Sequence, residues 1–362
     1  MNAIQIIIIN AAIFFGHYVI IASALNFQFG NAGIPNMSSN VSVAIGAYTV
    51  SAVVIRIAMW IGSAAGLLFK PNWVYDNPYN VRLLTELFKL KPLLSFSIFI
   101  LSLALAFLLG SGTGWMIGAL SGRLRATRLM ILLLIVSDAV SVIAANNQGI
   151  AGGTLGAFIP NFFSWYQGEQ MVIIATTILI VGLICYVIMR TMMNSPFGRL
   201  MRAVRDNEVT LDSTGKNVSA VRRQVMMFGS GVMAISGVLL SYYYGFVQNT
   251  MYDKVAYTFW PWLMITIGGL GNNAGGFVGT LICVSIIKGL SMTKQGIIPA
   301  LMGTTWIKII GYIENMLLGL MLIVFLIFMP RGVIPEKELS IKGINYKGIV
   351  LQNETEENRD KS

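Results

Sequence analysis

Charge is scarce in this sequence. Only 11% of its 362 residues are charged and 56% are hydrophobic, whereas a soluble domain averages about 25% charged residues. A chain this apolar cannot cover a globular surface with polar groups. The composition therefore excludes an ordinary soluble domain and predicts an integral membrane protein.

Cysteine, histidine and nucleotide-binding motifs are scarce as well. The two cysteines, Cys185 and Cys283, both lie in apolar runs and form no CxxC pair, so we expect no disulfide. With His17 as the single histidine, no cluster has the spacing of a metal site. The G-x-x-x-x-G-K-[ST] motif that cradles phosphates is missing, because the best candidate, 213–216, is followed by Asn217. We therefore expect no enzyme activity and no cofactor in this chain.

Long apolar runs recur along the whole chain. They lie at 4–27, 41–69, 92–120, 129–145, 170–189, 224–246, 261–290 and 307–329. Runs of this length predict membrane helices, because backbone groups in lipid must be satisfied internally, and the alternation typical of a β-barrel is missing. We predict an all-α polytopic membrane protein with about eight to ten crossings. The N-terminus lacks the basic region of a signal peptide, so we expect the first run to remain as a span.

Two polar or glycine-rich stretches interrupt this pattern. Residues 30–40 are too polar for lipid and too uncharged for an ordinary loop, which indicates a broken or re-entrant segment packed inside protein. Gly268, Gly269 and Gly271 divide the run 261–290 into two half-helices. Such interruptions in opposite halves are typical of transporters built from internal repeats.

Asparagines gather around the first interruption. Asn26, Asn31 and Asn36 could line a translocation path that accepts polar solutes by hydrogen bonding, or they could satisfy the backbone where the helix breaks. Asp138, in the fourth run, is a further candidate for that path, because ionisable groups inside a membrane are expensive and usually functional.

The few charges predict the orientation. The loop 190–223 has seven basic and three acidic residues, and a short turn carries three more arginines, Arg123, Arg125 and Arg128. The intervening loop 146–169 carries only Glu169. By the positive-inside rule the two basic loops are cytoplasmic and 146–169 is external. The net charge of +10 then indicates orientation rather than nucleic-acid binding. We expect a transmembrane domain over 1–330 and a polar cytoplasmic tail over 331–362.

The basic loop has an ordered pattern of its own. Ser195 before Pro196 predicts a helix start, Asp206 and Asn207 interrupt that helix, and a second short helix over 208–214 ends before Gly215. Three arginines at every third position share one broad face of the first helix: Arg199, Arg202 and Arg205. The loop is either a solvated basic segment beside anionic lipid or a docking element for a soluble partner.

This loop resembles the cytoplasmic loop of permeases in the branched-chain amino acid family of ABC importers. The pattern S-x-x-G-R-x-x-x-A-x-R-D-N-E is matched in register by Ser195, Gly198, Arg199, Ala203, Arg205, Asp206, Asn207 and Glu208, followed by Gly215, Asn217 and Val218. The stretches I-G-G-L-G at 267–271 and M-P-R-G at 329–332 agree with further landmarks of the family. The resemblance covers roughly 20–335 and is closest to the M-type subunit.

The resemblance implies a role for each part. The loop would dock into a cleft on a separate ATPase, which uses ATP and Mg²⁺ to rock the permease between outward- and inward-facing states. The residues assigned to docking are Gly198, Arg199, Arg202, Arg205, Asp206, Asn207, Glu208 and Gly215. Implied partners are a second homologous permease, two ATPase subunits, an external solute-binding protein and the lipid of a prokaryotic cell membrane. The solute would be a branched-chain or related amino acid.

Other classes of protein remain open at this point. An ion- or proton-coupled carrier working alone would use intramembrane acids such as Asp138 and Glu314 as its relay. A membrane scaffold would not require the ordered basic loop.

Overall fold

The protein is helical throughout the part of the chain that its computed structural model describes. The described residues are 3–72, 74–295, 316, 319–325, 327–329 and 331–336. Within them, strands are confined to one short antiparallel pair, β1 (Ala157–Phe158) with β2 (Phe246–Val247). The predicted all-α polytopic fold is confirmed.

Six continuous helical segments are long and apolar enough to cross a membrane. They are α1 (Ala3–Leu25) with η1 (Asn26–Asn31), α2 (Ser39–Thr49) with η2 (Val50–Val54) and α3 (Ile55–Ala64), α5 (Pro92–Ser121), α6 (Ala126–Asn146), α8 (Gln170–Asn194) and α11 (Val218–Tyr244). The segments Asn249–Gly268 and Asn273–Gly289 pass the same test only together, and they are bent by 119° at the break between them, as in a broken span or a re-entrant loop. The last predicted run, 307–329, lies largely outside the described residues, as does Glu314.

The bent pair of segments consists of four helical elements. It comprises η3 (Asn249–Met251), η4 (Val255–Phe259), α12 (Trp260–Gly268) and α13 (Asn273–Gln295). The two predicted half-helices around a glycine turn are thus confirmed. The first predicted interruption is confirmed too, because non-helical residues between η1 and α2 are buried inside the protein.

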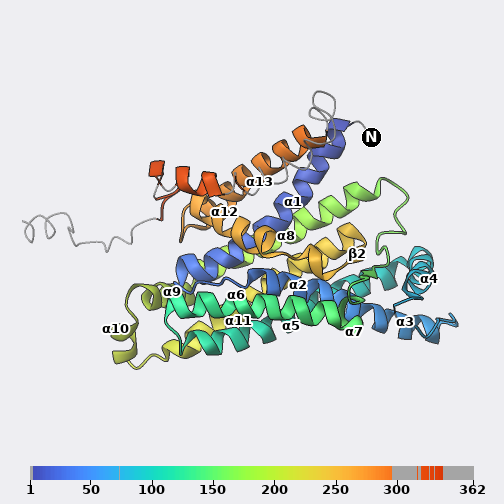
Figure 1. Cartoon of the computed structure of the whole chain (residues 1–362), viewed down its shortest axis with the longest axis horizontal. Coiled ribbons are helices and arrows are strands. Elements are labelled where there is room, and N and C mark those ends of the chain that lie inside the picture. The colour runs from blue at the N-terminus through green and yellow to red at the C-terminus, as the bar shows by residue number, and fades with distance from the viewer. Residues whose placement is uncertain are drawn as a thin grey trace, which may run out of the picture.

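Four short helices lie at the two ends of the bundle. α9 (Pro196–Asp206) and α10 (Glu208–Ser213) occupy one end, while α4 (Asn77–Leu90) and α7 (Gln148–Ala151) lie at the other with α3 (Figure 1). Arg222 donates from Nη1 to the carbonyl of Ser121 over 2.6 Å, which joins the basic turn after α5 to the end that carries α9 and α10. The two basic loops therefore share one end of the molecule, as the orientation argument requires.

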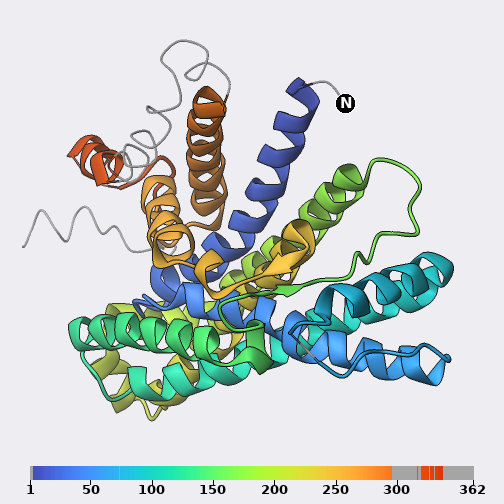
Figure 2. The ribbon, with the colours of Figure 1, turned by 45° about the vertical axis from the view of Figure 1, so that its right-hand side comes forward.

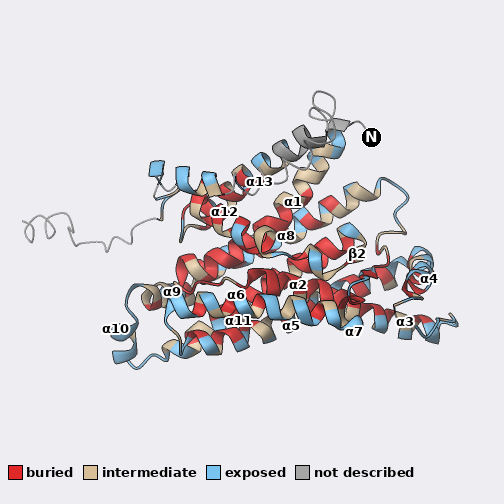
Figure 3. Cartoon of the chain, in the orientation of Figure 1, coloured by how far each residue is buried: buried red, intermediate tan, exposed pale blue. Residues whose placement is uncertain are grey.

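The less hydrophobic spans lie in the centre of the bundle and the more hydrophobic spans lie outside, as expected in lipid. α11 is the least hydrophobic of the six continuous spans, with a mean hydropathy of 1.7, yet 83% of that stretch is buried. α8 is the most hydrophobic, at 2.8, and only 22% of it is buried (Figure 3). Lipid tails are as apolar as leucine, so packing rather than apolarity decides which helix lies inside. Figure 2 shows α1, α8 and α13 splaying away from the layer of α5, α6 and α11.

Small residues let α5 and α11 approach closely. Gly110, Gly114 and Gly118 repeat every four residues along α5 and face α11. A Cβ on Gly118 would lie 2.7 Å from the Cα of Arg223, and a Cβ on Gly114 would overlap the carbonyl of Met226. Such stripes of small residues hold membrane helices together by backbone contact and dispersion.

The stripe can be tested with two glycines on the same helix. Gly114→Leu should destabilise the fold by about 1–3 kcal/mol, because the added side chain overpacks a closed contact. Gly112 faces open space, because no described atom lies within 4 Å of the position that a Cβ would take there, so Gly112→Leu should leave stability unchanged or slightly raised. Thermal unfolding of the purified protein in detergent compares the two. Equal melting temperatures for both variants would refute the close α5–α11 contact.

Candidate functional site: the α9–α10 loop and the Arg205 cluster

The predicted helix–turn–helix of the basic loop is confirmed. Ser195 precedes α9 in an extended conformation, with Pro196 in the first turn. Asn207 separates the helices and caps α10 by accepting a hydrogen bond from the Thr210 amide over 3.1 Å. Gly215 follows α10 with φ of +77°, a left-handed conformation that glycine adopts without strain.

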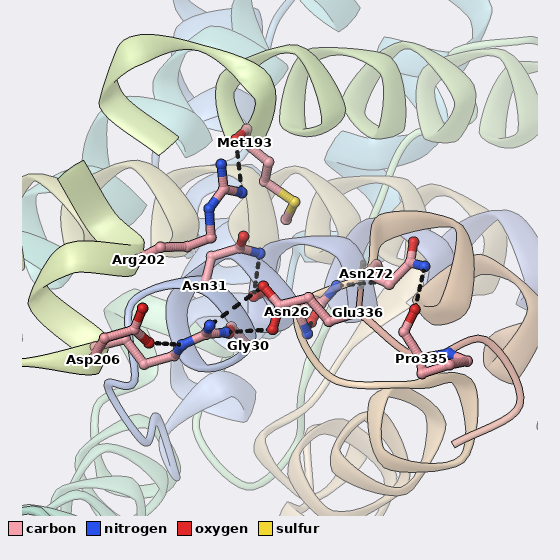
Figure 4. Close-up of polar contacts among 11 residues, drawn as sticks. Asn26, Gly30, Asn31, Met193, Arg202, Asp206, Asn272, Pro335 and Glu336 are labelled. Carbon is pink, nitrogen blue, oxygen red and sulfur yellow. Dashed lines mark hydrogen bonds and ion pairs between the residues drawn. The ribbon is translucent and has the colours of Figure 1, made fainter. Parts of the chain in front are cut away.

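The three arginines predicted on one broad face of α9 have different surroundings. Arg199 is exposed. Arg202 is half-buried and donates from Nη1 to the carbonyl of Met193 over 3.3 Å (Figure 4). Arg205 donates to the carbonyl of the buried Gly30. Arg199 is therefore the most accessible of the three, while Arg202 and Arg205 fasten α9 to the membrane domain.

Arg205 binds two distant segments of the chain and its own neighbour Asp206. Its Nη1 donates to the carbonyl of Gly30 over 2.6 Å and to Oε2 of Glu336 over 2.9 Å. Its Nη2 donates to Oε1 of Glu336 over 3.3 Å, and its Nε to Asp206 over 3.1 Å. Burial alone would lower the pKa of Arg205, but the hydrogen bonds and charges of Glu336 and Asp206 outweigh burial and raise it. The guanidinium thus remains charged and joins the end of η1 to the segment that follows the last predicted span.

The glycine turn between α12 and α13 belongs to the same group of contacts. Asn26 accepts from the Gly271 amide over 2.9 Å and donates to the carbonyl of Asn272 over 3.0 Å. Asn272 in turn donates to the carbonyl of Pro335 over 3.0 Å. Gly269 and Gly271 have φ of +118° and +79°. We call this set the Arg205 cluster: Asn26, Gly30, Arg205, Gly271, Asn272 and Glu336.

Gly268, the first glycine of the break, leaves no room for a side chain. A Cβ on Gly268 would overlap the carbonyl of Gly275, which lies in the first turn of α13. Amides of the segment 333–336 then bond to the end of α12, with Val333 donating to Ile267 over 2.8 Å and Ile334 to Gly268 over 2.9 Å. The first residues of the predicted tail are therefore packed against the membrane domain.

The asparagines near the first interruption bond to nearby backbone groups and to the side chain of Gln28. Asn31 donates to the carbonyl of Asn26 over 3.2 Å, and Asn36 donates to Gln28 over 2.8 Å. Asn36 also accepts from the amide of Ser38 over 2.9 Å. All of these side chains are fully buried. These bonds show that the asparagines satisfy backbone groups at the break, and their role in a translocation path stays a prediction.

Asp138 is not brought together with those asparagines. It lies on the outer face of α6, where its carboxylate pairs with Lys254 at 2.5 Å. Its neighbour Ser137 points inward instead and accepts from Nδ2 of Asn40 over 2.7 Å. An intramembrane acid paired in this way differs from an unpaired proton relay inside the bundle.

Comparison with known proteins supplies the family. The model of the "Branched-chain amino acid transport system / permease component" family matches residues 7–326. The chain belongs to this permease family. The permease is 32% identical over 328 residues to a probable branched-chain amino acid transport permease protein LivM of Methanocaldococcus jannaschii, covering 90% of this chain and 93% of that relative. It is a multi-pass membrane protein.

More distant relatives agree with this assignment. The high-affinity branched-chain amino acid transport system permease protein LivM of Salmonella typhimurium is 20% identical over 68% of this chain and 60% of its own length. The high-affinity branched-chain amino acid transport system permease protein LivH of Escherichia coli K12 is 23% identical over 65% of this chain and 73% of its own length. No solved structure matches the permease.

Sequence reasoning missed two residues of the permease that the structure brings forward. Glu336 falls in the predicted polar tail, and no local pattern reveals that it returns to Arg205. Val209 lies between Glu208 and Thr210, and its side chain is 80% exposed on α10. The sequence alone does not distinguish it from Leu211, which is partly buried against the core.

The Arg205–Glu336 pair can be tested with a double-mutant cycle. Arg205→Gln, Glu336→Gln and the double variant should give a coupling energy of about 1 kcal/mol in the free energy of unfolding, because the pair is bidentate and half-buried. The exposed Arg82–Glu86 pair at i,i+4 is the matched control and should give at most about 0.5 kcal/mol. Denaturation in detergent measures both cycles. Additive effects at Arg205 and Glu336 would show that the contact carries no interaction energy.

Proposed function

We propose that this chain is the membrane-spanning subunit of an ATP-driven importer for a branched-chain or related amino acid. Family membership supports the transport role, and the relatives' names supply the solute class. The sequence contains no phosphate-binding G-x-x-x-x-G-K-[ST] stretch, so we assign ATP hydrolysis, with its Mg²⁺, to separate subunits. A second homologous permease and an external solute-binding protein complete the proposed assembly.

The observation that carries the proposal is the construction of the α9–α10 loop. α10 has no fully buried residue and only Leu211 of this helix packs against the core, so packing against its own chain explains little of its order. It is held in place at its N-terminal end, where Glu208 pairs with Arg222 at the start of α11 and Asn207 caps the helix. The exposed Val209 then offers an apolar side chain among polar neighbours, which a docked partner would remove from water.

Arg205 gives this loop a mechanical connection to the membrane domain. A partner that displaces α9 would move the guanidinium that bonds to Gly30, and so act on the end of the first span. Through Glu336 and the segment 333–336, the same displacement would reach the glycine turn at Gly271. A rigid surface helix joined to two broken spans is what alternating access requires from a coupling element.

Uptake into proteoliposomes distinguishes the proposed function from its alternatives. With ATPase subunits and binding protein present, radiolabelled leucine should accumulate only when ATP is supplied on the side of the ATPase subunits. A pH or sodium gradient imposed without ATP should give no accumulation. Uptake by the chain alone that follows an ion gradient would establish a secondary carrier instead.

Val209 tests the docking role directly. Val209→Asp should abolish co-purification with the ATPase subunits, because a charge replaces the exposed apolar anchor, and melting of the permease alone should be unchanged. Leu90 is equally exposed, at 80%, at the opposite end of the molecule, so Leu90→Asp is the matched control and should retain the ATPase. Loss of association in both variants, or in neither, would contradict docking through α10.

A further inference from the structure

A polar cavity lies beside the Arg205 cluster. Its volume is about 480 Å³. It lies where the C-terminal end of α8, α9, the end of η1 and the start of α13 meet, and its wall includes Arg190, Asn194, Arg202, Asn31 and Asn273. Arg190 and Asn194 are exposed, so the cavity opens to the surface along the end of α8.

Buried polar groups in its wall lack partners among the described residues. Asn31 is 0% exposed and its Oδ1 has no hydrogen-bond partner, although its Nδ2 is bonded. Asn273 is 8% exposed and neither atom of its side-chain amide has one. The Nε of Arg202 is likewise buried without a partner. Buried polar groups are normally paired, so unpaired ones around a single cavity point to a ligand that supplies the bonds.

The charges around the cavity favour an anion. Three guanidinium groups, Arg190, Arg202 and Arg205, are set against the carboxylates of Glu336 and Asp206, and both carboxylates are already bonded to Arg205. The balance is one positive charge, located on the α8 and α9 side of the wall. α13 begins at the opposite side and adds the partial positive charge of a helix N-terminus. Asn272 already caps the amides of Ala274 and Gly275, so we assign the donor at that end to the side chain of Asn273.

The position of the cavity indicates where the anion comes from. Arg190 lies in the last turns of the span α8, and Asn273 is the first residue of α13. Both residues share the cavity with Arg202 of the surface helix α9, so the cavity lies at the end of the bundle that carries α9 and α10, at the depth of lipid headgroups. Basic pockets between spans at this level are suited to anionic headgroups.

We infer that this cavity binds the phosphate group of an anionic phospholipid. Arg190 and Arg202 would pair with the phosphate oxygens, and the amide nitrogen of Asn273 would donate a third hydrogen bond. A headgroup hydroxyl would satisfy Oδ1 of Asn31. A phosphodiester carries one negative charge, which equals the positive charge left over in the wall. The site is separate from α10 and does not depend on the proposed partners.

Binding can be measured on the full-length protein in maltoside detergent. Short-chain phosphatidylglycerol is the probe, phosphatidylcholine of equal chain length is the uncharged comparison, and inorganic phosphate tests the free anion. Phosphatidylglycerol should bind saturably and raise the melting temperature, whereas phosphatidylcholine should not. Arg190→Gln with Arg202→Gln should weaken phosphatidylglycerol binding about 30-fold, at roughly 1 kcal/mol for each arginine.

Two further variants separate a binding site from a general charge effect. Arg123 and Arg125 are exposed at the same end of the molecule, so their double Gln variant removes equal charge and should bind as the wild type does. Asn273→Leu removes no side-chain hydrogen bond within the described residues, so it should leave the lipid-free melting temperature unchanged and still weaken lipid binding several-fold. A purely structural role for Asn273 predicts the opposite pattern.

Each remaining outcome has a definite meaning. Binding of inorganic phosphate that is lost in the Arg190/Arg202 variant, without binding of phosphatidylglycerol, would keep the phosphate site and overturn the lipid as its source. Equal binding of the two lipids, or equal losses in the two arginine variants, would overturn the site itself.

Discussion

Peptide groups that leave a helix inside a membrane need hydrogen-bond partners from the protein, and this constraint governs the interior of the permease. Both of its broken spans meet the constraint with asparagine. Asn36 serves the non-helical stretch after η1, and Asn272 caps the start of α13. Asn26 makes two such bonds to the glycine turn from a different span. It accepts from the Gly271 amide and donates to the Asn272 carbonyl. The two breaks consequently stabilise each other, and neither can rearrange alone.

This mutual dependence determines how a signal could travel. Arg205 contacts the first break at Gly30, and through Glu336 it contacts the segment that lies against the second. A surface helix that holds both breaks with one guanidinium can move them together, which a loop attached to one span could not do. The physical requirement for alternating access is a pair of discrete arrangements shared by several elements, and a common charged anchor is one way to link them.

Much of this fold could be predicted from composition and pattern. The apolar runs predict the spans because length and hydropathy alone decide whether a helix can cross lipid, and the Ser-Pro, Asp-Asn and Gly215 positions predict the helix–turn–helix because capping is local. The candidate site could be predicted from the sequence only in part. The spacing of Arg199, Arg202 and Arg205 predicts a shared face, but only contacts with Met193 and Glu336 decide which of them turns inward. Glu336 lies 131 residues from Arg205, and no local rule connects them.

The electrostatics of the cavity follow from the same broken backbone. Ending α12 and starting α13 next to α9, at the end of the bundle, places a helix N-terminus, with its partial positive charge, beside the arginines of α8 and α9. Glu336 neutralises Arg205 alone, because both of its oxygens face that guanidinium. Within the described part of the chain, Arg202 and Arg190 have no carboxylate as an ion-pair partner at the depth where spans end. The break between α12 and α13 therefore leaves a positive charge without a counter-charge beside Arg190 and Arg202. An anion from the membrane surface would balance that charge.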